Sequence, residues 1–241
     1  MVNTSLPPPP NWGLDDITQY LDNYQQNQFA TFANKESFAP LKKIDKCFRK
    51  VLDKPINPRP WFPLQFLHRS HSAYLAACGL AMAGHTVEVN ALLRLCLESS
   101  AYGFYINKDV KRAELWLRRH DGIEEKKKVR NEFKQIKIEE HIVSEAPILA
   151  NIFKTLYERT IDYGAHPNER GFSINTKINE GEESTEFLQI YLQGDGLQLD
   201  LALKTTAQVG VWALSIFQLV YPEKWELLGI KHELIELKKH L

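Results

Sequence analysis

The sequence predicts a mainly α-helical fold: a helical bundle with one inserted β-hairpin and an N-terminal helical arm. Apolar residues recur at helical spacing through most of the chain, and proline or glycine clusters separate these segments. Only residues 172–192 alternate apolar and polar side chains as strands do. We divide the 241 residues into a disordered proline-rich lead (1–13), an N-terminal helical arm with a proline-rich connector (14–63), and a helical bundle domain (64–241) with the hairpin near 172–193.

Two helices are predicted in the N-terminal arm. Asp15 or Asp16 can cap the first, whose apolar positions begin at Ile17, because a side-chain oxygen at the N-cap accepts from free backbone N–H groups. The second is expected over 41–52, where apolar side chains share one face. The segment 55–63 is rich in proline, and we therefore expect a stiff, non-helical connector between the arm and the bundle.

The first half of the bundle is expected to consist of helices alone. One spans 64–83 and is ended by Gly84, and the next is capped by Thr86 and runs to about residue 106. The highly charged residues 108–141 predict two shorter helices with a break at 121–122. After Pro147 the apolar spacing predicts a further helix.

The second half is expected to contain the hairpin and two more helices. Its strands are predicted at 172–178 and 186–192, joined by a polar connection that contains glycine. An apolar helix from residue 197 or 199 to 220 follows and is ended by Pro222. The last predicted helix is amphipathic and covers 223–239.

Composition excludes several classes of protein. Because 30 basic residues balance 30 acidic ones, a dedicated nucleic-acid coat protein is disfavoured, although a local basic patch is still allowed. The three cysteines form no CxxC pair, which indicates reduced thiols in a cytoplasmic protein. No apolar run is long enough to cross a bilayer, and no signal peptide is recognised, so we expect no membrane association. Phosphate-loop, dinucleotide-binding, serine-elbow and zinc patterns are absent from the sequence, which predicts neither cofactor nor metal.

Arg159 and His166 are the one pair that suggests chemistry. They lie seven residues apart, about two helical turns, and would project from one face if the helix continued through Gly164. An arginine can hold the non-bridging oxygens of a phosphate, and a histidine can move a proton during attack by a ribose 2′-hydroxyl. The pattern therefore predicts metal-free RNA cleavage. Supporting contributions are expected from Thr160, Asp162 and Tyr163.

A purely structural interpretation of the same segment is also open. Arg159 could pair with Glu158 or Asp162, and Gly164 and Pro167 could end the helix so that His166 caps backbone carbonyls.

Arg94 and Glu98 lie four residues apart within an otherwise apolar helix, where charged groups need partners. We expect a buried ion pair that fixes helix register or supports the segment 159–166 from behind. A direct catalytic role for Glu98 is the less favoured alternative.

Three further patterns have competing interpretations. His68 and His71 have a spacing that metals use, but two ligands do not complete a site, so a metal-dependent hydrolase ranks third. The charged run 124–130 could meet a phosphate backbone, although an ordinary exposed helix is favoured. Four tryptophans are predicted to be core residues rather than a base-stacking platform: Trp61, Trp116, Trp212 and Trp225.

The segment 159–166 resembles the signature of the HEPN superfamily, in which an arginine is followed after four to six residues by a histidine. The Arg94/Glu98 pair and the general pattern of residues 64–220 are also similar to that group and to uncharacterised bacterial helical proteins placed near it. The resemblance implies an all-α bundle, a homodimer in which the motifs of both subunits meet, and metal-independent ribonuclease activity linked in many members to toxin or phage-defence systems. It implies that Arg159 binds the scissile phosphate and that His166 is the acid/base.

The competing hypothesis is a non-catalytic helical binding or interaction protein with a protein partner. The nuclease hypothesis requires Arg159 and His166 to be accessible and to face one cleft. The binding hypothesis expects an arginine engaged by local acids and a histidine buried in a turn.

Overall fold

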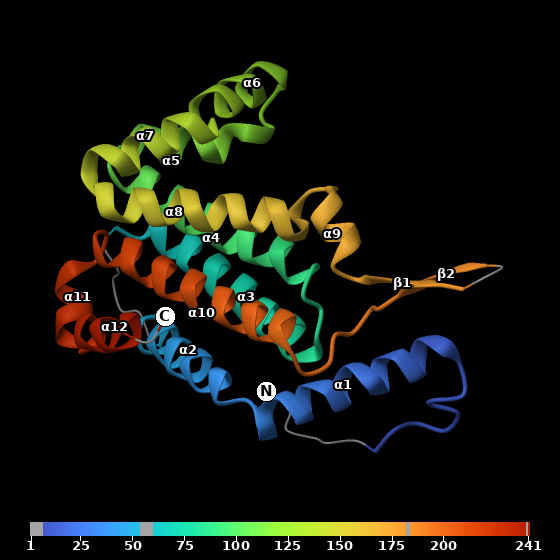
Figure 1. The fold of residues 1–241 in the computed structure, drawn as a ribbon. Helices are drawn as coiled ribbons and strands as arrows, with labels where there is room; N and C mark the ends of the chain where they lie inside the picture. The colour runs from blue at the N-terminus through green and yellow to red at the C-terminus, as the bar shows by residue number, and fades with distance from the viewer. Residues whose placement is uncertain (1–6, 54–59, 182–183, 240) are drawn as a thin grey trace.

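The computed structural model describes residues 7–53, 60–181, 184–239 and 241, and it confirms the mainly helical fold with a single hairpin. Three long apolar helices form its centre: α3 (Phe62–Ala83), α4 (Val89–Asn107) and α10 (Leu197–Gln218). The helix α8 (Pro147–Thr160) lies across α4 and α10 (Figure 1). Their facing side chains are almost all apolar and buried, so this is where most of the hydrophobic stabilisation arises.

The helix α2 (Ala39–Leu52) belongs to this bundle. Its sequence is amphipathic, and the apolar face is buried against α10 and α3. Of the two helices predicted in the arm, α2 therefore packs into the bundle. Two short helices, α11 (Pro222–Leu227) and α12 (Ile230–Lys238), close this end of the bundle. An ion pair of 2.8 Å between Lys50 Nζ and Glu233 Oε1 connects α12 to α2.

The helix α1 (Asp16–Asn34) lies along α3. Its N-cap is Asp15, one of the two residues predicted for this role. The helix is attached by polar side chains: Asn27, Gln28 and Thr31 donate hydrogen bonds of 2.8–3.0 Å to carbonyls near the end of α3. Of the predicted disordered lead, residues 1–6 lie outside the described residues. Trp12 is held against α1, because its indole donates to Asp22 at 2.6 Å.

The charged region forms three α-helices rather than the predicted two: α5 (Val110–Leu117), α6 (Ile123–Glu132) and α7 (Gln135–Glu145). The predicted break at 121–122 is present, preceded by a 3₁₀ turn (η2, Arg118–His120). A second break falls at Phe133, which leaves the helix and packs its buried ring on Tyr102 and Trp116. The three helices rise above α4 and α8 in Figure 1.

Several predicted helix boundaries need correction. The helix α3 begins at Phe62 and includes Pro63, because proline is tolerated in the first turn of a helix. Residues 55–59 of the predicted connector lie outside the described residues. Gly84 ends α3 in the left-handed region (φ 89°), as predicted. Thr86 does not cap α4, which begins at Val89 without a side-chain cap.

Near the C-terminus, Pro222 opens α11, and Gly229, with a positive φ of 67°, separates α11 from α12. The single helix predicted over 223–239 is therefore two helices. A proline fits the first turn of a helix, and a glycine in the left-handed region fits a break between helices.

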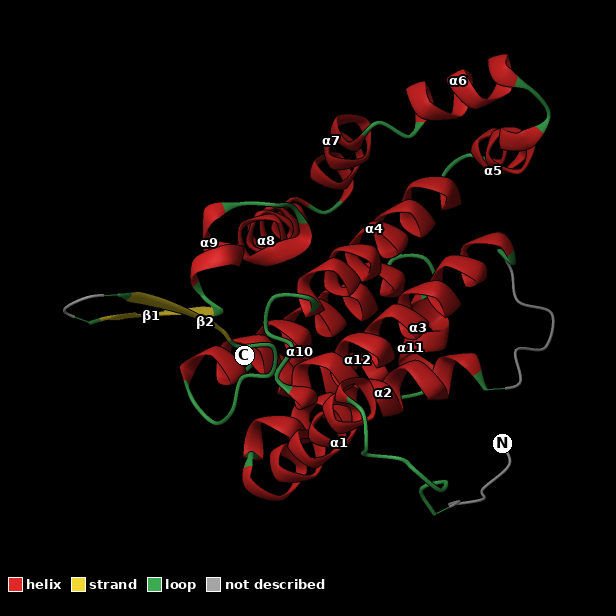
Figure 2. Ribbon diagram, turned by 90° about the vertical axis from the view of Figure 1, so that its right-hand side faces the viewer, coloured by secondary structure: helices red, strands yellow, loops and turns green. Residues whose placement is uncertain are grey.

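The hairpin pairs β1 (Thr176–Glu180) with β2 (Thr185–Gln189) in antiparallel register, with Ile178 opposite Phe187. The short helix α9 (Glu169–Ser173) occupies the beginning of the predicted first strand. Figures 1 and 2 show the hairpin projecting away from the bundle. Within the described part of the chain, no helix combines the length and the apolar character that a membrane span requires.

Candidate functional site

The helix that carries Arg159 does not continue to His166. The helix α8 ends at Thr160, and a π-helical turn (η3, Ile161–Ala165) follows with Gly164 at φ 139°. A Cβ at Gly164 would lie only 2.5 Å from the carbonyl oxygen and Cγ1 of Val87, so only glycine fits here. The condition for a common helical face is therefore not met.

Arg159 is engaged by α10 rather than by its own helix. Its Nη1 donates to Gln208 Oε1 at 2.6 Å and to Thr205 Oγ1 at 3.3 Å. The predicted pairing with Glu158 or Asp162 is wrong. The side chain lines an apolar groove between α8 and α10, which we call the α8–α10 groove.

His166 follows the π-helical turn with extended backbone (φ −133°, ψ 150°), and its side chain is exposed. The described residues give it no hydrogen-bond partner, and it does not line the α8–α10 groove. His166 does not cap backbone carbonyls, as the structural interpretation had expected. The side-chain amide of Asn90 donates to the Tyr163 carbonyl instead, and that of Asn168 donates to the Ile161 carbonyl. One chain therefore does not bring Arg159 and His166 into a common cleft.

The three supporting residues each have a local partner. The Thr160 hydroxyl is fully buried and donates to the Tyr157 carbonyl at 2.7 Å. Asp162 lies 4.0 Å from Arg170, whose guanidinium also lies 5.6 Å from the centre of the Tyr163 ring. Their catalytic roles stay a prediction.

Arg94 and Glu98 form a cluster with Tyr157 on α8. Arg94 Nε donates to Glu98 Oε1 at 2.8 Å, and Arg94 Nη2 donates to the Tyr157 hydroxyl at 2.7 Å. That hydroxyl donates to Glu98 Oε1 at 3.0 Å. Burial, together with the charge of Glu98, raises the pKa of Tyr157 to about 12. The cluster connects α4 to the helix that carries Arg159. The ion pair is half-buried rather than fully buried as expected, and its supporting role stays a prediction.

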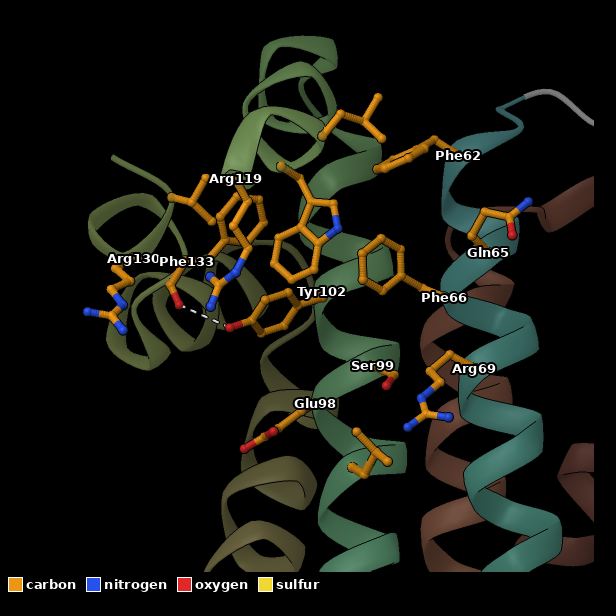
Figure 3. A pocket seen from close by; sticks show the side chains of 14 residues that line it. Phe62, Gln65, Phe66, Arg69, Glu98, Ser99, Tyr102, Arg119, Arg130 and Phe133 are labelled. Carbon is orange, nitrogen blue, oxygen red and sulfur yellow. Dashed lines mark hydrogen bonds between the residues drawn. The ribbon is translucent and has the colours of Figure 1, made fainter. Parts of the chain in front are cut away.

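The structure assembles a different cavity, which the sequence did not reveal. It has a volume of about 600 Å³ and lies between the α3–α4 pair and the α5–α6 segment (Figure 3). We call it the aromatic cleft. Its lining comprises Phe62, Gln65, Phe66, Arg69, Leu95, Glu98, Ser99, Tyr102, Trp116, Leu117, Arg119, Val129, Arg130 and Phe133.

The wall of the aromatic cleft is a connected set of rings. Trp116 lies edge-on to Phe66, Tyr102 and Phe133 at centroid distances of 5.6, 5.4 and 5.0 Å. Tyr102 also stacks on Phe133 at 5.3 Å and donates its hydroxyl to the Phe133 carbonyl at 3.2 Å. Because each ring is fixed by at least one neighbour, the wall is formed before any ligand enters.

The three arginines of the aromatic cleft have no acid partner. Arg69 and Arg130 are exposed and Arg119 is half-buried, and none of the three forms an ion pair or hydrogen bond within the described residues. Figure 3 shows Arg69 reaching from α3 toward Ser99, Arg119 beside Tyr102, and Arg130 pointing away. Burial and the charge of Glu98 raise the pKa of Tyr102, while Arg119 lowers it. Tyr102 is therefore a neutral ring at physiological pH.

Two local patterns could have indicated this cleft. Phe66 and Arg69 lie three residues apart on one helix, as do Ser99 and Tyr102 on the next, so each pair shares a face. Trp116 was predicted to be core, but it is half-buried and lines the cleft. The core prediction holds for Trp212 and Trp225 and fails for Trp61, which is 58% exposed.

The histidine pair is not arranged as a metal site. His71 Nε2 lies 2.7 Å from Asp45 Oδ1, with its ring stacked on Phe48, whereas His68 is exposed. In the part of the chain that the structure describes, no three His, Cys, Asp or Glu side chains gather as a metal site would require.

No protein-family model matches this chain, and no curated protein or solved structure is significantly similar to it.

Proposed function

We propose that this protein is a helical binding protein whose ligand is a small planar aromatic anion held in the aromatic cleft. The observation that carries the proposal is the pair of unpartnered guanidinium groups, Arg69 and Arg119, beside a preformed wall of aromatic rings. The volume of about 600 Å³ lies within the usual range of small-molecule sites.

Each half of the cleft favours one half of such a ligand. Aromatic walls bind flat rings through stacking and edge contacts, each with a contribution of roughly 1–3 kcal/mol for a nucleobase. A guanidinium presents a planar fork of donors that matches a phosphate or a carboxylate. Because Arg119 is half-buried, its charge is less screened by salt than that of a fully exposed arginine. A nucleoside monophosphate carries both features and is the type of ligand we propose.

The test is calorimetric titration with adenosine monophosphate, adenosine and inorganic phosphate. We expect adenosine monophosphate to bind most tightly, because only this probe uses both the rings and the guanidinium groups. Arg119→Gln should weaken its binding about tenfold or more while leaving adenosine unchanged. Arg118→Gln is the matched control, because that neighbour is exposed and pairs with Asp121. Equal affinity for all three probes, or an Arg119→Gln variant that binds like the wild type, would refute the proposal.

A metal-independent ribonuclease of HEPN type remains the second candidate, and the exposed, unpartnered imidazole of His166 favours it. Because one chain does not bring His166 to Arg159, this activity would require a homodimer in which one subunit supplies each residue. RNA cleavage in excess chelator, with Arg159→Ala and His166→Ala, tests it. Each variant should be inactive alone, and a mixture should regain part of the activity. No cleavage by the folded wild type would exclude it.

Cysteine chemistry supports a reducing compartment, and we propose that the protein acts in the cytoplasm. Cys47, Cys78 and Cys96 are free. Burial raises the pKa of Cys47 to about 11 and that of Cys78 to about 12, and it also raises the pKa of Cys96. Such thiols are unreactive packing groups.

A further inference from the structure

The α8–α10 groove is a second cavity, independent of the aromatic cleft. Its volume is about 550 Å³, and α12 and the C-terminal residue close one side of it. The lining is mainly apolar and consists of Ile148, Leu149, Asn151, Ile152, Thr155, Leu156, Arg159, Gln208, Val211, Trp212, Ser215, Lys238 and Leu241.

The helices α8 and α10 run antiparallel along the groove, and different residues lie at its two ends. At one end Arg159 donates to Gln208, and at the other the Trp212 indole donates to the Leu149 carbonyl at 2.9 Å. Its lining on α10 extends from Gln208 to Ser215, seven residues or roughly 10 Å of helix. The lining on α10 is thus about as long as a medium alkyl chain.

The groove carries more positive than negative charge. Its lining contains two cations, Arg159 and Lys238, no aspartate or glutamate, and the main-chain carboxylate of Leu241, which accepts a hydrogen bond from Gln208 Nε2 at 3.0 Å. Gln208 and Thr205 fix only Nη1 of Arg159, which leaves its other donors free among the described residues. Lys238 forms no ion pair with any described side chain, and partial burial lowers its pKa. Two cations beside apolar surface attract an anion that carries an apolar body.

We propose that the α8–α10 groove binds a single-chain anionic amphiphile, a medium-length alkyl carboxylate. Its head lies at Arg159 and Lys238, and its chain lies along Ile152, Leu156 and Trp212.

The length of the groove suits one alkyl chain, because its lining on α10 spans roughly 10 Å. Burial of each methylene should strengthen binding about fourfold until the chain is longer than the groove.

The experiment is calorimetric titration of the full chain with hexanoate, octanoate, decanoate and neutral octanol. We expect affinity to rise with chain length and octanoate to bind at least tenfold more tightly than octanol. Arg159→Gln should remove this advantage while octanol binding stays unchanged. Arg170→Gln, an exposed arginine outside the groove, is the control and should change nothing.

Two outcomes would overturn the proposal. One is equal binding of octanoate and octanol by the folded wild type, or no binding of either. The other is a dimer in sedimentation that Ile152→Glu dissociates while no amphiphile binds, because a second copy then covers the groove. Circular dichroism of each variant confirms that binding is measured on folded protein.

Discussion

The segment 159–166 and the aromatic cleft show opposite relations between sequence and space. In the segment, two residues that are close in sequence are separated by a change of helix geometry at Gly164. In the cleft, Phe66, Tyr102, Trp116 and Arg119 come from different elements and line one cavity. Helical spacing places residues on a common face only while the helix continues. A binding site made from several helices leaves only short local traces in the sequence.

The largest expected effect tests the end of the helical geometry at Gly164. Gly164→Ala should lower the free energy of unfolding by about 3 kcal/mol or more, because its Cβ would meet the Val87 carbonyl and because φ 139° strains any other residue. Urea denaturation measures the change. Gly194→Ala is the control, since nothing lies within 4 Å of the added Cβ, and it should change stability by less than about 0.5 kcal/mol. Similar losses in both variants would show that Gly164 is not specially constrained.

The next effect tests the support behind α8. Tyr157→Phe removes the hydroxyl shared by Arg94 and Glu98 and should cost about 1–2 kcal/mol of stability. Tyr163→Phe is matched, because no hydrogen bond of its hydroxyl is found among the described residues, and it should be nearly neutral. If Tyr157→Phe were equally neutral, the cluster would not support the helix that carries Arg159.

A smaller effect of opposite sign is expected in the α8–α10 groove. The Ser215 hydroxyl is buried without a hydrogen-bond partner in the described structure. Ser215→Ala should therefore stabilise the protein by about 1 kcal/mol. Thermal denaturation without ligand measures this, and Ser144→Ala, an exposed serine, serves as the control. A destabilised Ser215→Ala variant would reveal a partner for the hydroxyl.

The smallest expected effect is a pH dependence of stability caused by two interior histidines. Burial lowers the pKa of His71 and of His141 below the usual value. Their contribution to stability is complete above the unfolded pKa of about 6.5 and is lost as pH falls, because the unfolded chain binds protons more readily. The urea concentration at the unfolding midpoint should therefore be lower at about pH 5.5 than at about pH 7.5. A variant with both His71→Asn and His141→Asn should lose less stability over this pH range. If its midpoint changed with pH as much as that of the wild type, these two histidines would not be the cause of the pH dependence.

Much of the fold could be predicted because single helices carry their own signals. The amphipathic face of α2 and the left-handed Gly84 both follow from local chemistry. The break at Phe133 could not be predicted, because no glycine or proline marks it. Phe133 leaves the helix to fill space between Tyr102 and Trp116, which is a tertiary effect.

The candidate sites also contain some features that local sequence signals indicate and others that depend on tertiary structure. Gly164 and Pro167 were visible stop signals, so the separation of Arg159 from His166 could be anticipated as an alternative. The partners of Arg159, Thr205 and Gln208, lie 46 and 49 residues away, and no local pattern indicates them. The aromatic cleft depends on how α5 and α6 lie against α4, so it emerges only from the tertiary structure.

The most direct test of the aromatic cleft as the binding site is a titration with adenosine monophosphate, followed through the indole N–H resonances of the five tryptophans. Trp116 lines the cleft, whereas Trp12, Trp61, Trp212 and Trp225 lie outside it. We predict that the Trp116 resonance shifts with the saturation curve of binding and that the other four stay in place. A shift at any other tryptophan with Trp116 unchanged, or no shift at saturating nucleotide, would contradict the proposed site.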